Sequence, residues 1–256
     1  METPHFIFWE AIKAFGLIFL ALLAAKIISA LPISSPKGSR RAKIVKPALI
    51  LLVVALVVLG AKALGTDVAA EIYYSSALGN LAHGEVPLAC SNASRAVARR
   101  PRDLRYWEAL DRAKVAARQY ASALQDEPAL RALAGGVLDA DDAARFATCR
   151  YQLGQFGEVV SDTQRILQKD RFYPFAYLLQ GMAYIALKQY SAAEDSLLRL
   201  LGMFPTQADG VAELAQAYYL AGDLPRALAV LDATRRYTFP PQARARFEEL
   251  KAFYAQ

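Results

Sequence analysis

Histidine and cysteine, the side chains most often found in metal and nucleophilic centres, are scarce in this chain of 256 residues. The two histidines are His5 and His83, and neither they nor the two cysteines, Cys90 and Cys149, stand at a spacing that pairs metal ligands. A phosphate-binding glycine loop followed by lysine is missing, and so is a G-x-S-x-G nucleophile motif. We therefore expect no enzyme, no cofactor, no metal site and no small-molecule substrate.

One acidic run could suggest metal binding. Asp139, Asp141 and Asp142 stand together at the expected start of a helix. An aspartate that caps the first turn, followed by carboxylates that complement the helix dipole, accounts for the same pattern. We favour the helix cap over the metal site.

A weak pattern is present, and it recurs every 34 residues. In the two clearest copies, Tyr177, Gly181, Tyr184, Tyr190 and Ala193 are followed at that spacing by Val211, Ala215, Tyr218, Leu224 and Ala227. The same register extends upstream through Ala147, Trp107 and Tyr73, with one longer step that indicates two inserted residues near Gly135 and Gly136. Gly84, Gly154 and Gly222 fall where paired helices would need a tight turn.

This period resembles that of the tetratricopeptide repeat (TPR) family over residues 69–240. The resemblance implies antiparallel helix pairs that bury their apolar faces only by stacking on the next copy. We predict an all-α chain in which residues 67–256 form a TPR-like solenoid of about five helix pairs, with a solvating cap over residues 241–256. Asp126, Glu127 and Pro128 are expected to interrupt one second helix. A generic all-α bundle is the alternative.

The first 66 residues have a different composition, and we interpret them as a membrane anchor. Residues 6–31 and 48–64 are almost wholly apolar and long enough to span a hydrocarbon core as helices. A cleaved signal peptide is the alternative for the first segment. A signal peptide would begin with basic residues and end at a small-residue cleavage site, and this segment has neither feature. The connector over residues 32–47 carries five basic residues and no acid: Lys37, Arg40, Arg41, Lys43 and Lys46.

The basic connector sets the expected orientation, because short loops rich in lysine and arginine stay on the cytoplasmic side. We therefore predict a two-span protein of the bacterial inner membrane, with the connector cytoplasmic and the TPR domain periplasmic. Residues 1–66 hold eight basic and two acidic side chains, which is the whole net charge of +6. The neutral remainder argues against nucleic acid as a partner, and the basic anchor suits membrane lipid.

Basic residues are locally dense in the first repeats, where Asp103, Glu108 and Asp111 are the acids among them. The set comprises Arg95, Arg99, Arg100, Arg102, Arg105, Arg112, Lys114 and Arg118. A solvated helix face with intrahelical ion pairs is one interpretation. A docking patch for an acidic partner or for lipid headgroups is the other.

In the resembled family the first helices of successive repeats line a groove that holds other proteins. Carried onto this register, the resemblance implies a partner-binding row of Tyr74, Leu78, Arg105, Glu108, Arg112, Thr148, Tyr151, Phe175, Met182, Ile185, Gln216 and Tyr219. The mixture of aromatic, thioether and charged side chains suits a bound helix or extended peptide. Packing between repeats is the alternative role for each of them. Cys90 and Cys149 are separated by a whole repeat, and we expect buried free thiols.

These features predict a non-enzymatic, membrane-anchored scaffold that binds other inner-membrane or envelope proteins to assemble an export or biogenesis complex. The layout of two spans followed by repeats is similar to the Pel exopolysaccharide export component PelE, to HemY-like proteins and to cytochrome c maturation scaffolds. The last group has a much longer cytoplasmic loop. An accessory subunit that docks through its hairpin is the rival, with Glu10, Lys13 and Lys26 facing a partner's helices.

Overall fold

The computed structural model describes residues 65–255 and three isolated positions before them, Gly16, Lys26 and Ala55. Apart from those three positions, the two predicted spans and the basic connector lie outside the described residues. Within residues 65–255, no helix is both long enough and apolar enough to cross a membrane.

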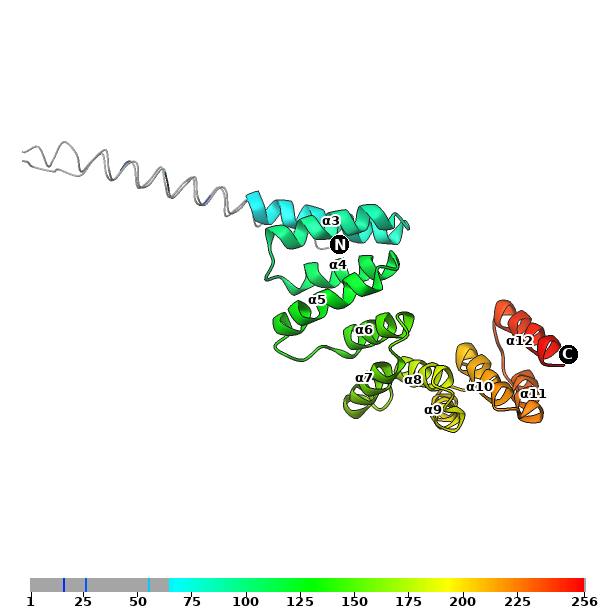
Figure 1. Cartoon of the computed structure of the whole chain (residues 1–256). Coiled ribbons are helices and arrows are strands. Elements are labelled where there is room, and N and C mark those ends of the chain that lie inside the picture. The colour runs from blue at the N-terminus through cyan, green and yellow to red at the C-terminus, as the bar shows by residue number, and fades with distance from the viewer. Residues whose placement is uncertain (1–15, 17–25, 27–54, 56–64, 256) are drawn as a thin grey trace, which may run out of the picture. The chain divides into compact units, whose positions relative to one another are not determined.

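The described chain is a succession of helices, and residues 65–255 contain no strand (Figure 1). A helix over residues 65–82 comes first. Helices of 14 residues then alternate with helices of 13: α3 (Val86–Arg99), α4 (Leu104–Ala116), α5 (Tyr120–Leu133), α6 (Ala140–Gln152), α7 (Phe156–Lys169), α8 (Pro174–Ala186), α9 (Tyr190–Met203) and α10 (Ala208–Leu220). The shorter α11 (Leu224–Ala233), a 3-10 turn (Thr234–Arg236) and α12 (Pro241–Tyr254) follow. This element order is that of the predicted TPR-like solenoid.

One backbone conformation recurs at the same position of every repeat. Gly84, Gly154 and Gly222 have φ of 75°, 77° and 82°, and Arg118 and Lys188 at the corresponding positions have φ of 56° and 59°. At the glycine turns and at Lys188, the N–H of the next residue donates to the carbonyl five residues earlier, at 2.8–2.9 Å. The left-handed turns predicted at the three glycines are confirmed, and the register places arginine and lysine in the same strained conformation.

The predicted insertion is confirmed between α5 and α6. Six residues connect these helices, whereas four connect α3 to α4, α7 to α8 and α9 to α10. Gly135 and Gly136 are both in the connection, with φ of 72° and 93°. Positive φ at two successive residues suits glycine, which has no Cβ to clash with the backbone.

The predicted interruption of the second helix at Pro128 is wrong, because α5 runs through that residue. An interior proline removes one hydrogen bond and costs about 3 kcal/mol. Pro128 is exposed, while Ala123, Asp126 and Leu130 are buried along the same helix. Burial of that face outweighs the loss of one hydrogen bond, so the proline remains within the helix.

The described residues divide into two compact units, with the boundary between Ala117 and Arg118 in the turn after α4. In unit 1, small side chains of residues 65–82 and α3 pack against α4 around the fully buried Tyr106. In unit 2, the first helices α6, α8 and α10 each pack on their own second helix and on the next helix of the row, and α12 ends the row by packing on α10 and α11. Figure 1 shows these four helices as one layer, with α7, α9 and α11 as the other.

The last helix caps the core of unit 2 as predicted. Phe247 and Tyr254 are buried, and Leu250 packs against the same core, whereas Arg244 and Glu249 on other faces are exposed. Pro240 precedes the helix and Pro241 is its first residue, a position where the missing N–H has no intrahelical partner to lose.

Candidate protein-binding groove

The layer of first helices in unit 2 carries most of the predicted partner-binding residues. Helices α6, α8, α10 and α12 lie in sequence side by side, and the row curves so that this layer is on its inner side (Figure 1). Tyr151 on α6 and the Glu213 carboxylate on α10 interact electrostatically although α8 stands between their helices. We call this face of α6, α8, α10 and α12 the inner face.

Helix α6 contributes Thr148 and Tyr151. The Thr148 hydroxyl donates to the Ala144 carbonyl at 2.8 Å, so its proton is already used within the helix. The Tyr151 ring is half-buried and meets Phe156 edge-on, with ring centroids 5.3 Å apart. Burial, with a further contribution from Glu213, raises the pKa of Tyr151. Tyr151 therefore stays a neutral hydrogen-bonding phenol at ordinary pH.

Helix α8 provides the most apolar part of the inner face. Phe175 is 41% exposed at its start, and Met182 is half-buried against the core of unit 2. Ile185 is only 8% exposed and belongs to that core. A partner could therefore contact Phe175 and Met182 directly, while Ile185 supports them from beneath.

Aromatic rings from α10 and α12 meet at the far end of the inner face. Tyr219 stacks on Tyr254 with centroids 4.3 Å apart and an interplanar angle of 15°, and it lies 5.8 Å from Phe253. Phe253 is 58% exposed, and Gln216 is exposed one turn before Tyr219. Tyr219 thus joins the capping helix to the row, and Phe253 extends the aromatic surface.

Sequence reasoning missed the charges beneath this surface. Glu213 on α10 is mostly buried and faces Arg246 on α12 at 3.8 Å. Burial raises the pKa of the Glu213 carboxyl, while Arg246 opposes that shift and Asp209 adds to it. Asp209 itself receives a hydrogen bond from Arg246 at 2.7 Å. The local sequence gives one indication that this carboxylate is buried, because Glu213 stands between the apolar residues Ala212 and Leu214.

A second polar contact joins the start of α6 to the start of α8. The Tyr173 hydroxyl donates to Asp141 at 2.7 Å, and burial together with this hydrogen bond raises the pKa of Tyr173 well above its usual range. Asp139 accepts a hydrogen bond from the Asp142 N–H at 2.7 Å, so the predicted helix cap is confirmed. Within the described residues, no group of three histidine, cysteine or acidic side chains could hold a metal ion.

Unit 1 carries the other predicted residues on its first helix and on α4. Tyr74 meets Tyr106 with centroids 5.2 Å apart, and the Arg105 guanidinium lies 5.4 Å from both rings. Arg105 also pairs with Asp103 at 3.0 Å and with the buried Glu71 at 3.5 Å. Leu78 and Arg112 are exposed, and Glu108 is half-buried. Arg105 is therefore part of a structural network as well as a surface cation.

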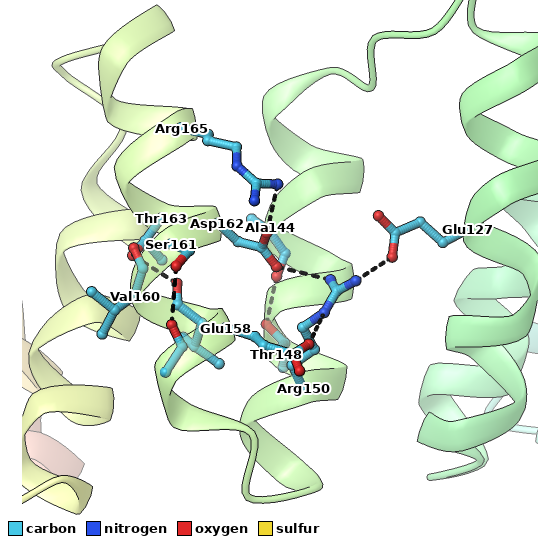
Figure 2. A network of polar contacts seen from close by, with 12 residues as sticks. Glu127, Ala144, Thr148, Arg150, Glu158, Val160, Ser161, Asp162, Thr163 and Arg165 are labelled. Atoms are coloured by element: carbon cyan, nitrogen blue, oxygen red, sulfur yellow. Dashed lines mark hydrogen bonds and ion pairs between the residues drawn. The ribbon is translucent and has the colours of Figure 1, made fainter.

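An ion-pair network joins three helices of unit 2 around Arg150. Its guanidinium contacts Glu127 of α5 at 2.5 Å and, on α7, Asp162 at 2.8 Å and Glu158 at 3.1 Å (Figure 2). Arg165 approaches Asp162 from the other side at 3.3 Å. Burial raises the pKa of Asp162, and both arginines oppose that shift. The network fixes α6 between α5 and α7, and each of these carboxylates faces an arginine.

The two cysteines carry free thiols. Cys149 is buried as expected, whereas Cys90 is only half-buried. Burial raises the pKa of the Cys90 thiol, with a smaller opposing effect of Lys114. A raised pKa leaves less of the reactive thiolate, so Cys90 is not activated as a nucleophile.

Solved structures share this architecture at low sequence identity. MamA (41-end) from Desulfovibrio magneticus RS-1 has a TM-score of 0.60 and 14% identity, covering 66% of this chain and 94% of that one. The TPR protein TTC0263 of Thermus thermophilus has a TM-score of 0.55 and 20% identity, covering 71% and 98%. YrrB, a TPR protein with an unusual peptide-binding site, has a TM-score of 0.52 and 20% identity, covering 62% and 81%.

No protein-family model matches the chain, and no curated protein matches it. The similarity to the solved structures is one of fold. The chain therefore has the TPR fold, as its 34-residue period predicts.

Proposed function

We propose that this protein is a non-enzymatic scaffold that binds a partner protein on the inner face of unit 2. The observation that carries the proposal is a set of accessible side chains on the inner face: the apolar Phe175 and Met182 on α8, the amide of Gln216 on α10 and the apolar Phe253 on α12. Aromatic and thioether side chains on a preformed surface suit a helix or an extended peptide. A peptide-binding site in YrrB, which has the same fold, supports this choice.

The proposed scaffold is anchored in a bacterial inner membrane by residues 6–31 and 48–64, with its repeats in the periplasm. The apolar length of both segments and the basic residues between them support the anchor and its orientation. Its partners are other inner-membrane or envelope proteins. We propose that it assembles an export or biogenesis complex, and the layout shared with PelE favours exopolysaccharide export.

Site-specific photocrosslinking in native membranes tests the binding face. A photoreactive phenylalanine analogue replaces Phe175 or Gln216, and the control places it at Leu198, an exposed residue on the second helix α9. We expect one discrete partner adduct from the first two positions and none from Leu198. Adducts at Leu198 alone, or at no position, would contradict the proposed face.

Two further measurements test the proposed pathway and distinguish the scaffold from the rival, an accessory subunit that docks through its hairpin. A strain that lacks the protein should secrete less exopolysaccharide. The double variant Phe175→Ala and Gln216→Ala should show the same defect although the protein is still present.

Exchange of residues 1–64 for an unrelated hairpin should preserve function in a scaffold that acts through its repeats. Loss of function after that exchange would instead indicate a subunit that docks through its transmembrane helices.

A further inference from the structure

Four arginines gather at the end of unit 1 where the described chain begins. Arg95 and Arg99 are on α3, and Arg100 and Arg102 are in the connection to α4. We call these four residues the arginine cluster. Three of them are exposed, and Arg100 is half-buried.

The antiparallel path of α3 brings the arginine cluster beside the first helix. The Arg100 Nε lies 3.5 Å from Asp67, and the Arg99 and Arg95 guanidinium groups lie 4.5 and 5.5 Å from the centre of the Tyr73 ring. Asp67 is two residues, about 3 Å along a helix, beyond Gly65. The cluster therefore lies next to the point where the apolar run of residues 48–64 ends.

Most of the charge of the arginine cluster is not neutralised by carboxylates. Arg95, Arg99 and Arg102 have no ion pair with an acidic side chain within residues 65–255, whereas Arg105 pairs with Asp103 at 3.0 Å. Stacking on Tyr73 holds two guanidinium groups in place and leaves their charge unchanged. Planar guanidinium groups present paired N–H donors that match the oxygen atoms of a phosphate.

We infer that the arginine cluster binds the phosphate headgroups of anionic phospholipids and holds unit 1 against the membrane surface. The inference rests on the proposed anchor, which places this end of unit 1 beside a bilayer. The headgroup region is roughly 5–8 Å deep on each side of the hydrocarbon core, so residues directly after the span lie within or beside it. Anionic lipid attracts basic residues so placed, over a distance set by the Debye length.

The chain provides its own reporter for this contact. The Trp107 indole N–H donates to the Pro101 carbonyl at 2.8 Å, so its ring is held against the loop that carries Arg100 and Arg102. The sequence has two tryptophans, and Trp9→Phe leaves Trp107 as the only one. The full-length Trp9→Phe protein is reconstituted into phosphatidylcholine vesicles with or without phosphatidylglycerol. A nitroxide-labelled phosphatidylcholine headgroup then quenches the fluorescence of Trp107 if the loop lies at the surface.

Phosphatidylglycerol should increase the quenching of Trp107 roughly twofold or more, because each nearby basic residue gains affinity for an anionic surface. Salt at about 0.5 M should remove most of the increase, since it shortens the Debye length to roughly 4 Å. The combined Arg95→Gln, Arg99→Gln and Arg102→Gln variant should lose the increase. The matched control removes three exposed arginines of unit 2 by the substitutions Arg235→Gln, Arg236→Gln and Arg244→Gln. This variant should retain the increase in Trp107 quenching.

Arg102→Gln alone covers the case in which the triple variant does not fold. The Arg102 side chain is exposed and makes no ion pair with an acidic side chain within residues 65–255, so this change should reduce the phosphatidylglycerol effect without unfolding the protein. Equal quenching with and without phosphatidylglycerol overturns the inference, and so does an effect that the triple variant retains. A partner protein that is lost from the triple variant while the lipid effect persists would assign the cluster to an acidic protein.

Flotation separates failure of the inference from failure of the anchor. Vesicles are washed in alkaline carbonate, which removes peripheral proteins, and are then floated through a density gradient. A chain that does not float refutes the proposed anchor. A chain that floats, with no effect of phosphatidylglycerol on Trp107, leaves the anchor standing and refutes lipid binding by the arginine cluster.

Discussion

A buried glycine sets how closely α8 and α9 approach each other. A Cβ added at Gly181 would lie 2.6 Å from the Leu197 Cγ, and Leu197 is fully buried, so this side chain or its helix would have to shift. Gly181→Ala should therefore destabilise the protein by about 1–3 kcal/mol through overpacking, although alanine favours helix more than glycine does. Chemical unfolding of the purified protein measures the change.

Gly202→Ala on α9 is the matched control. A Cβ at this position meets no atom within 4 Å, so only the helix propensity changes, with an expected gain of roughly 1 kcal/mol. Equal stability of the two variants would show that the Gly181 contact is not tight.

Lys188 occupies a backbone conformation that its side chain disfavours. Its φ is 59°, at the repeat position where Gly222 has φ of 82°. Relief of left-handed strain is worth about 1–2 kcal/mol, and the greater unfolded-state freedom of glycine returns about 0.5–1 kcal/mol of it. Lys188→Gly should therefore stabilise the protein by roughly 0.5–1 kcal/mol in thermal or chemical unfolding. Gly222→Ala, the reverse change at the matching turn, should destabilise it.

Glu213 should make stability depend on pH. Burial raises the folded-state pKa of this carboxyl above its ordinary value of 4.5. As the pH rises through that value, the unfolded state releases its proton first, and the free energy of unfolding falls until the folded carboxyl also ionises. Glu213→Gln removes this loss, so its stability relative to the unmodified protein should rise with pH, starting near pH 4.5. Glu249→Gln, at an exposed carboxylate, serves as the control for the unfolding series.

At the scale of the element, Pro128 marks a weak point in α5. The residue is exposed inside the helix and cannot donate a backbone hydrogen bond. Pro128→Ala should stabilise the protein by about 1–3 kcal/mol, part of the cost of an interior proline. Pro87→Ala at the start of α3, where the missing N–H is harmless, should change the stability much less. Equal effects would show that α5 has fully adapted to its proline.

The helices and their register could be predicted because small residues mark the places where helices cross. Ala193 and Ala227 stand 34 residues apart and are both fully buried. The continuation of α5 could not be predicted, because the rule for proline is local, whereas the burial of Leu130 and the ion pair between Glu127 and Arg150 depend on other helices. Arg150, which holds Glu127, is 23 residues further along the chain.

For the candidate site, the sequence could assign residues to a helix face but not their burial, because periodicity identifies the face of a helix and not the depth of each side chain. Phe175 and Gln216 are accessible as expected, whereas Ile185 is buried. Phe253 was missed because the capping helix was interpreted only as a solvated end. Glu213 was missed because its partner Arg246 comes from that same helix, outside the repeat pattern.

At the scale of the whole molecule, the orientation of the proposed anchor has a direct test. Five basic residues in the connector, residues 32–47, should keep that loop in the cytoplasm and place the repeats outside it. Protease added to intact spheroplasts should therefore digest residues 65–255 while a cytoplasmic marker protein stays intact. Replacing Arg40, Arg41 and Lys43 with asparagine should leave part of the population protected, because less positive charge then retains the loop. Protection of the repeats in the unmodified protein until the membrane is lysed would falsify the orientation, whereas release of the intact chain by carbonate would refute the anchor itself.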